Sequence, residues 1–209
     1  MIEYMTEQEQ IQQLKNWVKQ YGMMILLGML LAVALATGWH AWANHCKRVT
    51  VRAAIIYDNM LTQKAQNNAN AIEAAHQLIA RYSRTPYADM AAFLIARDAI
   101  LKKDSTTAIQ QFDWVIHHSK AESIREIARI REARVLIADK KAESALNILN
   151  TINDDAFIGL IDEARGDAYL LAEKTLDAKT AYQRALKELP RADVTRPILA
   201  MKLANLETL

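Results

Sequence analysis

Residues 166–190, GDAYLLAEKTLDAKTAYQRALKELP, decide the fold of this chain. Six positions in the stretch carry a pattern of small and aromatic side chains: Gly166, Tyr169, Ala178, Tyr182, Ala185 and Pro190. Gly166 and Ala178 leave room for two helices to approach closely, and the tyrosines fill the space that remains between them. Pro190 ends the second helix, because proline cannot continue one. The stretch therefore predicts an antiparallel pair of helices.

The same small-then-large spacing recurs upstream, where an alanine marks the second helix of each predicted pair. These alanines are Ala71, Ala108, Ala145 and Ala178, and they lie 37, 37 and 33 residues apart. A period near 34 residues with this pattern is typical of tetratricopeptide repeats. We therefore expect an all-α fold in which residues 49–209 form a right-handed α-solenoid of tetratricopeptide-like helix hairpins. A helix over Thr195–Leu206 is expected to cap its end.

Short polar breaks separate the predicted helices. They lie near Asn67-Asn68, Ser83–Pro86, Lys103-Asp104, Ser119-Lys120, Asp139–Lys141, Asn153–Asp155 and Pro190–Asp193. Five glycines and three prolines in 209 residues leave few signals for β-turns or long loops. A hydrophobic content of 52% with 24% charged residues describes a chain that folds. Composition and breaks together favour helices alone.

An uncharged segment precedes the repeats. From Gln20 to Cys46 there is no Asp, Glu, Lys or Arg. Within it, the 21 residues of Met23–Ala43 are apolar except for Thr37 and His40. At about 1.5 Å per residue, they span roughly the 30 Å hydrocarbon core of a bilayer. Aromatic residues flank the segment as an interfacial belt requires: Trp17, Tyr21, Trp39 and Trp42. We predict a transmembrane helix over residues 22–43.

A cleaved signal peptide is the alternative to this anchor, because Ala41-Trp42-Ala43 has the small-x-small pattern of a cleavage site. The apolar core is longer than that of a signal peptide, and the leader carries Glu3, Glu7 and Glu9. These features favour an uncleaved anchor. A mature N-terminus at Asn44 would instead indicate a soluble periplasmic protein.

The charges beside the span leave its orientation open. Two lysines precede it, Lys15 and Lys19, and three cationic residues follow it, Lys47, Arg48 and Arg52. Read literally, the positive-inside rule favours a cytoplasmic C-terminus. Long domains, however, cross the membrane largely regardless of such charges, and a difference of one does not decide the matter.

Small residues recur at four-residue spacing along the span, at Gly28, Ala32 and Ala36. This spacing places them on one helix face, where another membrane helix can approach closely. Equally, Gly and Ala are common in such helices without any docking role.

Ahead of the span, residues Thr6–Tyr21 predict a short amphipathic helix that lies at the membrane surface or merges with the span. Thr6 and Glu9 have the spacing of a capping box.

The sequence carries no catalytic or metal-binding motif. No H-E-x-x-H, G-x-S-x-G, P-loop or Rossmann glycine pattern occurs. The single cysteine, Cys46, excludes a Cys-rich zinc site and an internal disulfide. His117 and His118 are neighbours that point about 100° apart on a helix, a poor metal pair. The net charge of +2 gives no support to nucleic-acid binding. We expect no enzyme, catalytic residue, cofactor, metal, nucleic acid or small-molecule substrate.

Several stretches along the whole chain follow the pattern of one known family. They are residues 9–22 (EQIQQLKNWVKQYG), 128–136 (ARIREARVL) and 163–167 (EARGD), with Gly28, Gly38-Trp39, Ala54, Tyr57, Ala178 and Tyr182. The chain in this respect resembles the YfgM family, ancillary subunits of the bacterial Sec translocon.

The resemblance implies a location, a topology and partners. It implies an uncleaved single-pass anchor in the inner membrane of a Gram-negative bacterium, with residues 1–21 in the cytoplasm and the repeat domain in the periplasm. It also implies association with the SecYEG translocon and with the membrane-anchored chaperone PpiD, and a role in passing exported polypeptides to periplasmic chaperones. The alternative is a repeat scaffold for another inner-membrane or envelope complex.

The repeat register also predicts a partner-binding groove. In tetratricopeptide folds the first helix of each pair lines a concave face, and extending the register of the last repeat upstream gives one set of residues: Met90, Phe93, Arg97, Ile127, Ile130, Arg134, Glu163 and Asp167. The hypothesis is an apolar groove with a row formed by Arg97, Arg134 and Asp167. The alternative is that much of this apolar surface is core, packed against a neighbouring helix.

Overall fold

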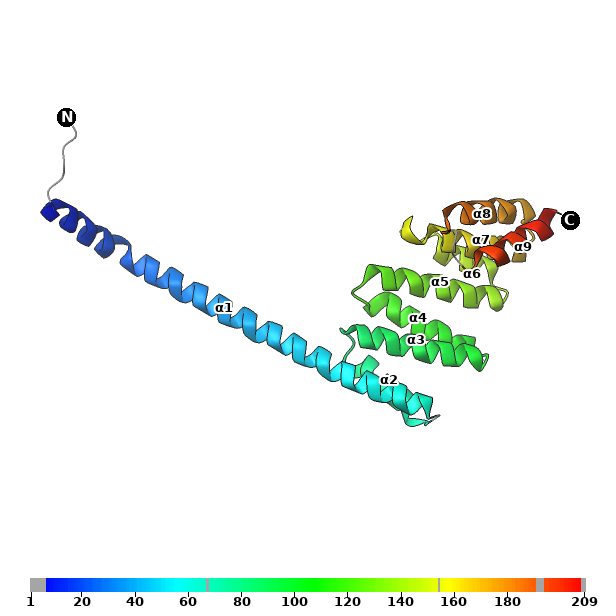
Figure 1. Cartoon of the computed structure of the whole chain (residues 1–209), viewed down its shortest axis with the longest axis horizontal. Helices are drawn as coiled ribbons and strands as arrows, with labels where there is room; N and C mark the ends of the chain where they lie inside the picture. Colours follow the sequence, from blue (N-terminus) through cyan, green and yellow to red (C-terminus); the bar gives the residue numbers. More distant parts are fainter. Residues whose placement is uncertain (1–6, 67, 154, 191–193, 208–209) are drawn as a thin grey trace, which may run out of the picture. The chain divides into compact units, whose positions relative to one another are not determined.

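The computed structural model describes residues 7–66, 68–153, 155–190 and 194–207. Over these residues every regular element is a helix, so the predicted all-α fold is confirmed. The elements in chain order (Figure 1) are α1 Glu7–Ala65, α2 Asn70–Arg81, α3 Pro86–Leu101, α4 Ser105–His118, α5 Glu122–Ala138, α6 Ala142–Leu149, the 3₁₀ turn η1 Asp155–Phe157, α7 Ile158–Leu171, α8 Thr175–Glu188 and α9 Arg196–Glu207. The chain divides into two compact units, Met1–Val51 and Arg52–Leu209.

In the first unit, the predicted amphipathic lead-in and the apolar span form one uninterrupted helix. Of the two arrangements expected for residues 6–21, merger with the span is the one observed from Glu7 onward. The proposed capping box of Thr6 and Glu9 lies outside the described residues and side chains. Helix α1 also continues through residues 44–48, because no glycine or proline interrupts it between Trp39 and Ala65.

The apolar side chains of the span within this helix face outward in every direction. Among the described residues, one helix is long and apolar enough to cross a membrane, with a mean hydropathy of 2.0 over its most apolar window and none of that window buried. Two aromatic residues contact each other in a tilted arrangement at each end of the span, Trp17 with Tyr21 at 5.9 Å and Trp39 with Trp42 at 5.4 Å between ring centroids. A helix that is hydrophobic all round requires an apolar environment, which a bilayer provides.

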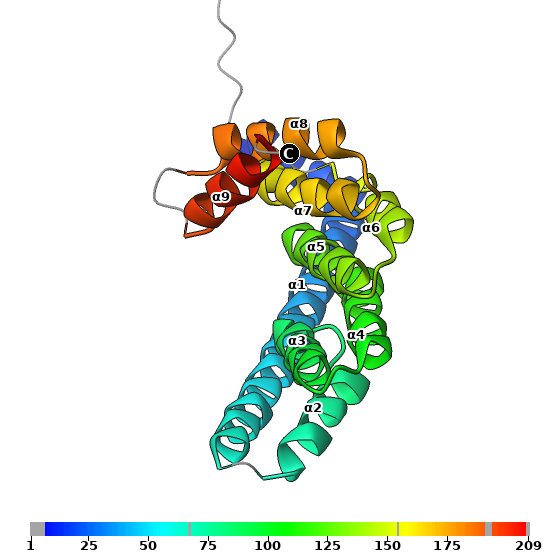
Figure 2. The same cartoon turned by 90° about the vertical axis from the view of Figure 1, so that its right-hand side faces the viewer.

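The second unit is a stack of helix pairs. The C-terminal part of α1 pairs with α2 in one shared core, followed by α3 with α4, α5 with α6 and α7 with α8. Figure 2 shows α3, α5 and α7 along one side of the stack and α2, α4 and α6 along the other. The alanines that set the period, Ala71, Ala108, Ala145 and Ala178, are all at most 1% exposed. Their burial explains the period, because a larger side chain at these positions would separate the paired helices.

The last pair has the close contact that its sequence predicts. A methyl group added at Gly166 would lie 2.3 Å from the ring of Tyr182, far inside van der Waals contact. The Tyr182 side chain is fully buried, and its hydroxyl donates a hydrogen bond to Asp167 at 2.6 Å. Burial, and then this hydrogen bond, raises the pKa of Tyr182. Gly166 is therefore required by the tyrosine ring that crosses it.

From α3 onward, the first helix of each pair ends in the same kind of turn, and a residue other than glycine occupies its left-handed position. Lys103, Lys140 and Glu173 follow α3, α5 and α7 and have φ values of 60°, 61° and 60°. The next N–H in each case donates to a carbonyl five residues back, as Asp104 does to Ala99 at 2.9 Å. This is the Schellman arrangement, in which the left-handed residue is usually glycine. The helix pairs therefore share one turn geometry although the residues in it differ.

Candidate partner-binding groove

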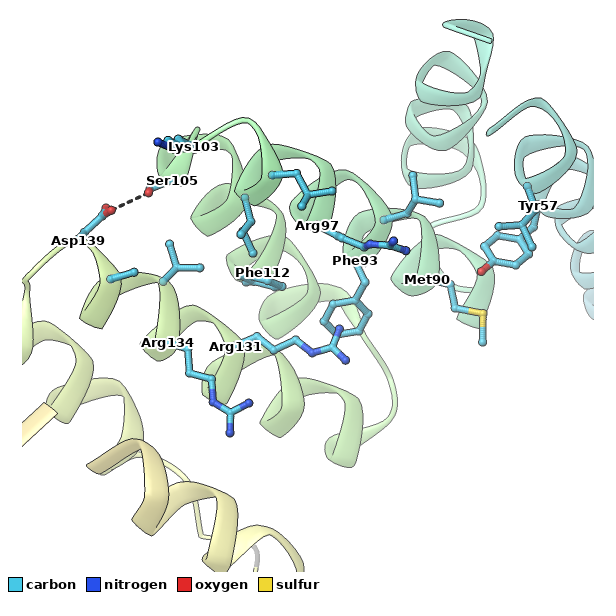
Figure 3. Close-up of a pocket in the computed structure, with 16 residues that line it drawn as sticks. Tyr57, Met90, Phe93, Arg97, Lys103, Ser105, Phe112, Arg131, Arg134 and Asp139 are labelled. Carbon is cyan, nitrogen blue, oxygen red and sulfur yellow. Dashed lines mark hydrogen bonds between the residues drawn. The ribbon is translucent and has the colours of Figure 1, made fainter. Parts of the chain in front are cut away.

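A groove of about 920 Å³ opens within the second unit, on the side formed by the first helices of the early pairs (Figure 3). Helices α1, α3, α4 and α5, with the turns after α3 and α5, supply its lining: Tyr57, Leu61, Met90, Phe93, Leu94, Arg97, Ile100, Leu101, Lys103, Ser105, Phe112, Arg131, Arg134, Val135, Ala138 and Asp139. More than half of these side chains are apolar, and four are cationic.

The centre of the groove is built around the ring of Phe93. It contacts Phe112, with ring centroids 6.0 Å apart, and the guanidinium of Arg131 lies 4.7 Å from its centroid. Phe112 is buried, so it holds Phe93 against the protein. The Arg131 contact is a cation–π interaction, which orients both side chains. Phe93 is thus a fixed, partly accessible aromatic surface, the type of residue on which binding energy concentrates.

Exposed aliphatic side chains surround this aromatic centre. Met90 is 48% exposed, Ile100 45% and Leu101 73%. Leu61, from the end of α1, adds a fourth at 41%. A contiguous apolar surface of this kind, rimmed by charges, marks an interaction site in soluble domains.

The charged side chains of the groove are predominantly cationic. Arg97, Lys103, Arg131 and Arg134 line it, whereas Asp139 is the one acid among the described residues that line it. Asp139 is already engaged, because it accepts a hydrogen bond from Ser105 at 2.6 Å and lies 3.7 Å from Lys141. Burial, with a further contribution from the neighbouring charge of Arg134, lowers the pKa of Arg131. The groove therefore holds an excess of positive charge.

Half of the residues that the sequence placed in the groove do line it. Met90, Phe93, Arg97 and Arg134 come together from α3 and α5. Ile127 is half-buried and does not line the groove. Ile130 is only 3% exposed and packs in a core cluster with Leu136 and Ala164, so it offers no surface to a partner. For Ile130 the alternative interpretation, core packing, is the one the structure supports.

The two acidic residues expected in the groove are instead neutralised within the chain. Glu163 accepts a hydrogen bond from Arg134 at 2.8 Å. Asp167 accepts two from Lys202 of α9, at 2.7 and 2.8 Å, besides that from Tyr182. The capping helix therefore supplies the counter-ion for the last pair, and the expected row of Arg97, Arg134 and Asp167 ends at Arg134.

Sequence reasoning missed several residues of the groove. Leu101 could have been found, because it lies eight residues after Phe93 and four after Arg97 on the same face of α3. No spacing in the sequence placed Arg131 in the groove, because its position depends on a contact with Phe93, which belongs to another helix. Tyr57 and Leu61 belong to α1, whose continuation into the first pair was not expected as one helix.

The remaining candidate residues lie outside the groove. Gly28, Ala32 and Ala36 lie on an exposed face of α1, and a Cβ at Gly28 would meet nothing within the chain. Over the described part of the chain, no cluster of three His, Cys, Asp or Glu side chains could hold a metal. His117 lies 3.2 Å from Asp113, and His118 stacks on the ring of Trp114.

Comparison with known proteins gives consistent matches over nearly the whole chain. The tetratricopeptide repeat-like domain family matches residues 15–208. A protein of Escherichia coli K12 named "Ancillary SecYEG translocon subunit" is 26% identical over 97% of this chain and 98% of its own length. Proteins of the same name from Neisseria gonorrhoeae and Haemophilus influenzae are 29% and 25% identical, over 99% and 96% of this chain and 100% and 97% of their own lengths. No solved structure matches significantly.

Proposed function

The chain belongs to the tetratricopeptide repeat-like family and, within it, to the YfgM family of ancillary SecYEG translocon subunits, and we propose that it is a membrane-anchored protein-interaction module of the Sec translocon. The observation that carries the proposal is the groove around Phe93, an exposed apolar and cationic surface on a rigid stack of helices. Such a surface binds polypeptide and performs no chemistry of its own.

The apolar helix supplies the second part of the proposal, which is attachment to the membrane beside the channel. Confinement near the translocon raises the effective concentration of the groove, so weak and rapidly exchanging contacts are sufficient. We assign residues 1–21 to the cytoplasm, 22–43 to the bilayer and 49–209 to the periplasm. In this topology the groove meets polypeptides as they leave the channel.

The topology has a direct test. Alkaline phosphatase fused after Leu209 should be active, because this reporter folds only in the periplasm, and the mature protein should begin at or near Met1. An inactive fusion would reverse the orientation. A mature N-terminus at Asn44 would replace the anchor with a cleaved signal peptide.

The finer part of the proposal concerns the partners. We propose that the groove contacts exported polypeptides and that the protein brings them to periplasmic chaperones, among them a PpiD-like membrane-anchored chaperone. A repeat scaffold for another envelope complex would use the same fold, but its crosslinks would be to stationary subunits. The identity of the molecules that reach the groove therefore distinguishes the two functions.

Site-specific photocrosslinking tests this function. A photoreactive residue in place of Met90 should capture exported chains, translocon subunits or the chaperone, whereas one in place of Gln183, exposed on α8, should capture them weakly. Phe93→Asp should reduce capture from Met90 at least about tenfold, because it removes the central ring and places a charge there. Unchanged capture by a folded Phe93→Asp protein would exclude the groove, and exclusive capture of an unrelated envelope complex would favour the scaffold.

A further inference from the structure

Two cations of the groove, Arg97 and Arg131, have no acidic partner in the described part of the chain. Among the described residues, no carboxylate forms an ion pair or hydrogen bond with Arg97 or Arg131. The neighbouring Arg134 is paired with Glu163, and Lys64 of the first pair with Asp98. The chain therefore neutralises Arg134 and Lys64 and leaves Arg97 and Arg131, beside the Phe93 ring, without counter-ions.

These unpaired cations lie beside the exposed apolar side chains of the groove. Figure 3 shows the Arg131 guanidinium over the Phe93 ring and the end of Arg97 near that ring, whereas Arg134 extends away from them. Arg131 is held close to the ring and is partly removed from water, and its charge is opposed by that of Arg134. Like charges held near one another in this way are stabilised when a carboxylate approaches them.

We infer that the groove selects polypeptide segments in which acidic side chains alternate with large apolar ones. The apolar side chains would pack on Met90, Phe93 and Leu101, while the carboxylates would pair with Arg97 and Arg131. Charge complementarity carries the inference, because apolar contact alone would accept neutral and basic segments equally. The inference rests on the proposed function, since it specifies what kind of segment the groove binds.

Peptide binding to the full chain in phosphatidylcholine nanodiscs tests the inference. The probe is a fluorescent peptide in which Leu and Phe alternate with Glu, and its matched peptides carry Gln or Lys in place of every Glu. The acidic peptide should bind about tenfold or more tightly than the Gln peptide, and the Lys peptide more weakly still. The preference should diminish as salt is raised, because these side chains are partly exposed.

Charge-removing variants locate the effect. Arg97→Gln should weaken binding of the acidic peptide about threefold to tenfold and leave binding of the Gln peptide unchanged. Arg97 is the cleaner of the two positions, because Arg131 also supports the Phe93 ring. Arg81→Gln is the matched control, since it removes the same charge from an exposed site at the end of α2, outside the groove. An equal loss in both variants would mean attraction by net charge alone and would overturn the inference.

The outcomes also separate this inference from the function on which it rests. If all three peptides bind equally and Phe93→Asp abolishes their binding, the groove binds polypeptide without charge preference and only the inference fails. If Phe93→Asp leaves every peptide bound as before, the groove is not the binding site and both fail. If a photoreactive residue in place of Met90 captures a second copy of this chain, the groove is a contact between copies, and the inference that it selects acidic segments is overturned.

Discussion

Replacing Tyr182 with Ala should lower the free energy of unfolding by about 3–5 kcal/mol, the loss typical of a fully buried aromatic side chain. The Tyr182 ring fills the space above Gly166, and its hydroxyl is bonded to Asp167. Truncation leaves a cavity between α7 and α8 and removes one donor from a carboxylate at the junction with α9. Urea unfolding of the full chain in mild detergent, followed by circular dichroism, measures the loss.

A double-mutant cycle with Gly166 tests the cause of this effect. In the wild-type background, Gly166→Ala should cost about 1–3 kcal/mol, because the added methyl group would lie 2.3 Å from the Tyr182 ring. In the Tyr182→Ala background the ring is absent, so the same substitution should cost little. Additive losses would show that the ring and the glycine do not constrain each other, contrary to the packing described above.

This packing was predictable because the constraint acts at fixed offsets within one helix pair. A glycine at 166 and an aromatic residue at 182 are expected together only if two helices cross there. The alanine that accompanies them, Ala178, recurs upstream as Ala145 and Ala108. The point at which the first helix of each pair ends was harder to predict from the sequence. Lys103 and Lys140 adopt left-handed conformations that no glycine announces, so the turns were placed by polarity alone.

The groove was predictable only in part, for a related reason. The spacing of the repeats indicates which residues of α3 share one face, and it correctly gave Met90, Phe93 and Arg97 as lining residues. It does not specify how far the next helix rotates or what covers it. Ile130 is therefore buried between α5 and α7, and Asp167 is occupied by Lys202 from the capping helix, 35 residues away in sequence.

Stability should also fall as the pH rises through the range below neutrality, because Glu132 is buried on the face of α5 toward α4. The residue is 8% exposed. Burial, and then the charge of Asp113, raises its pKa from 4.5 to about 7, against the opposing charges of His117 and Arg129. At low pH the carboxyl group is protonated in both folded and unfolded chains, so it carries no penalty. Between about pH 4.5 and 7 only the unfolded chain releases the proton, which favours unfolding.

The penalty should level off above pH 7 at about 3 kcal/mol, because the folded protein then also releases the proton. Glu132→Gln removes the titrating group while keeping its shape. The variant should match the wild type near pH 4.5 and be more stable by up to about 3 kcal/mol at pH 8, as measured by urea unfolding at both values. Glu122→Gln, an exposed carboxylate in the first turn of the same helix, is the control for lost charge. A Glu132→Gln protein that gains nothing at pH 8 would mean that the folded chain accommodates the ionised carboxylate, and that the α4–α5 contact is not sensitive to its charge.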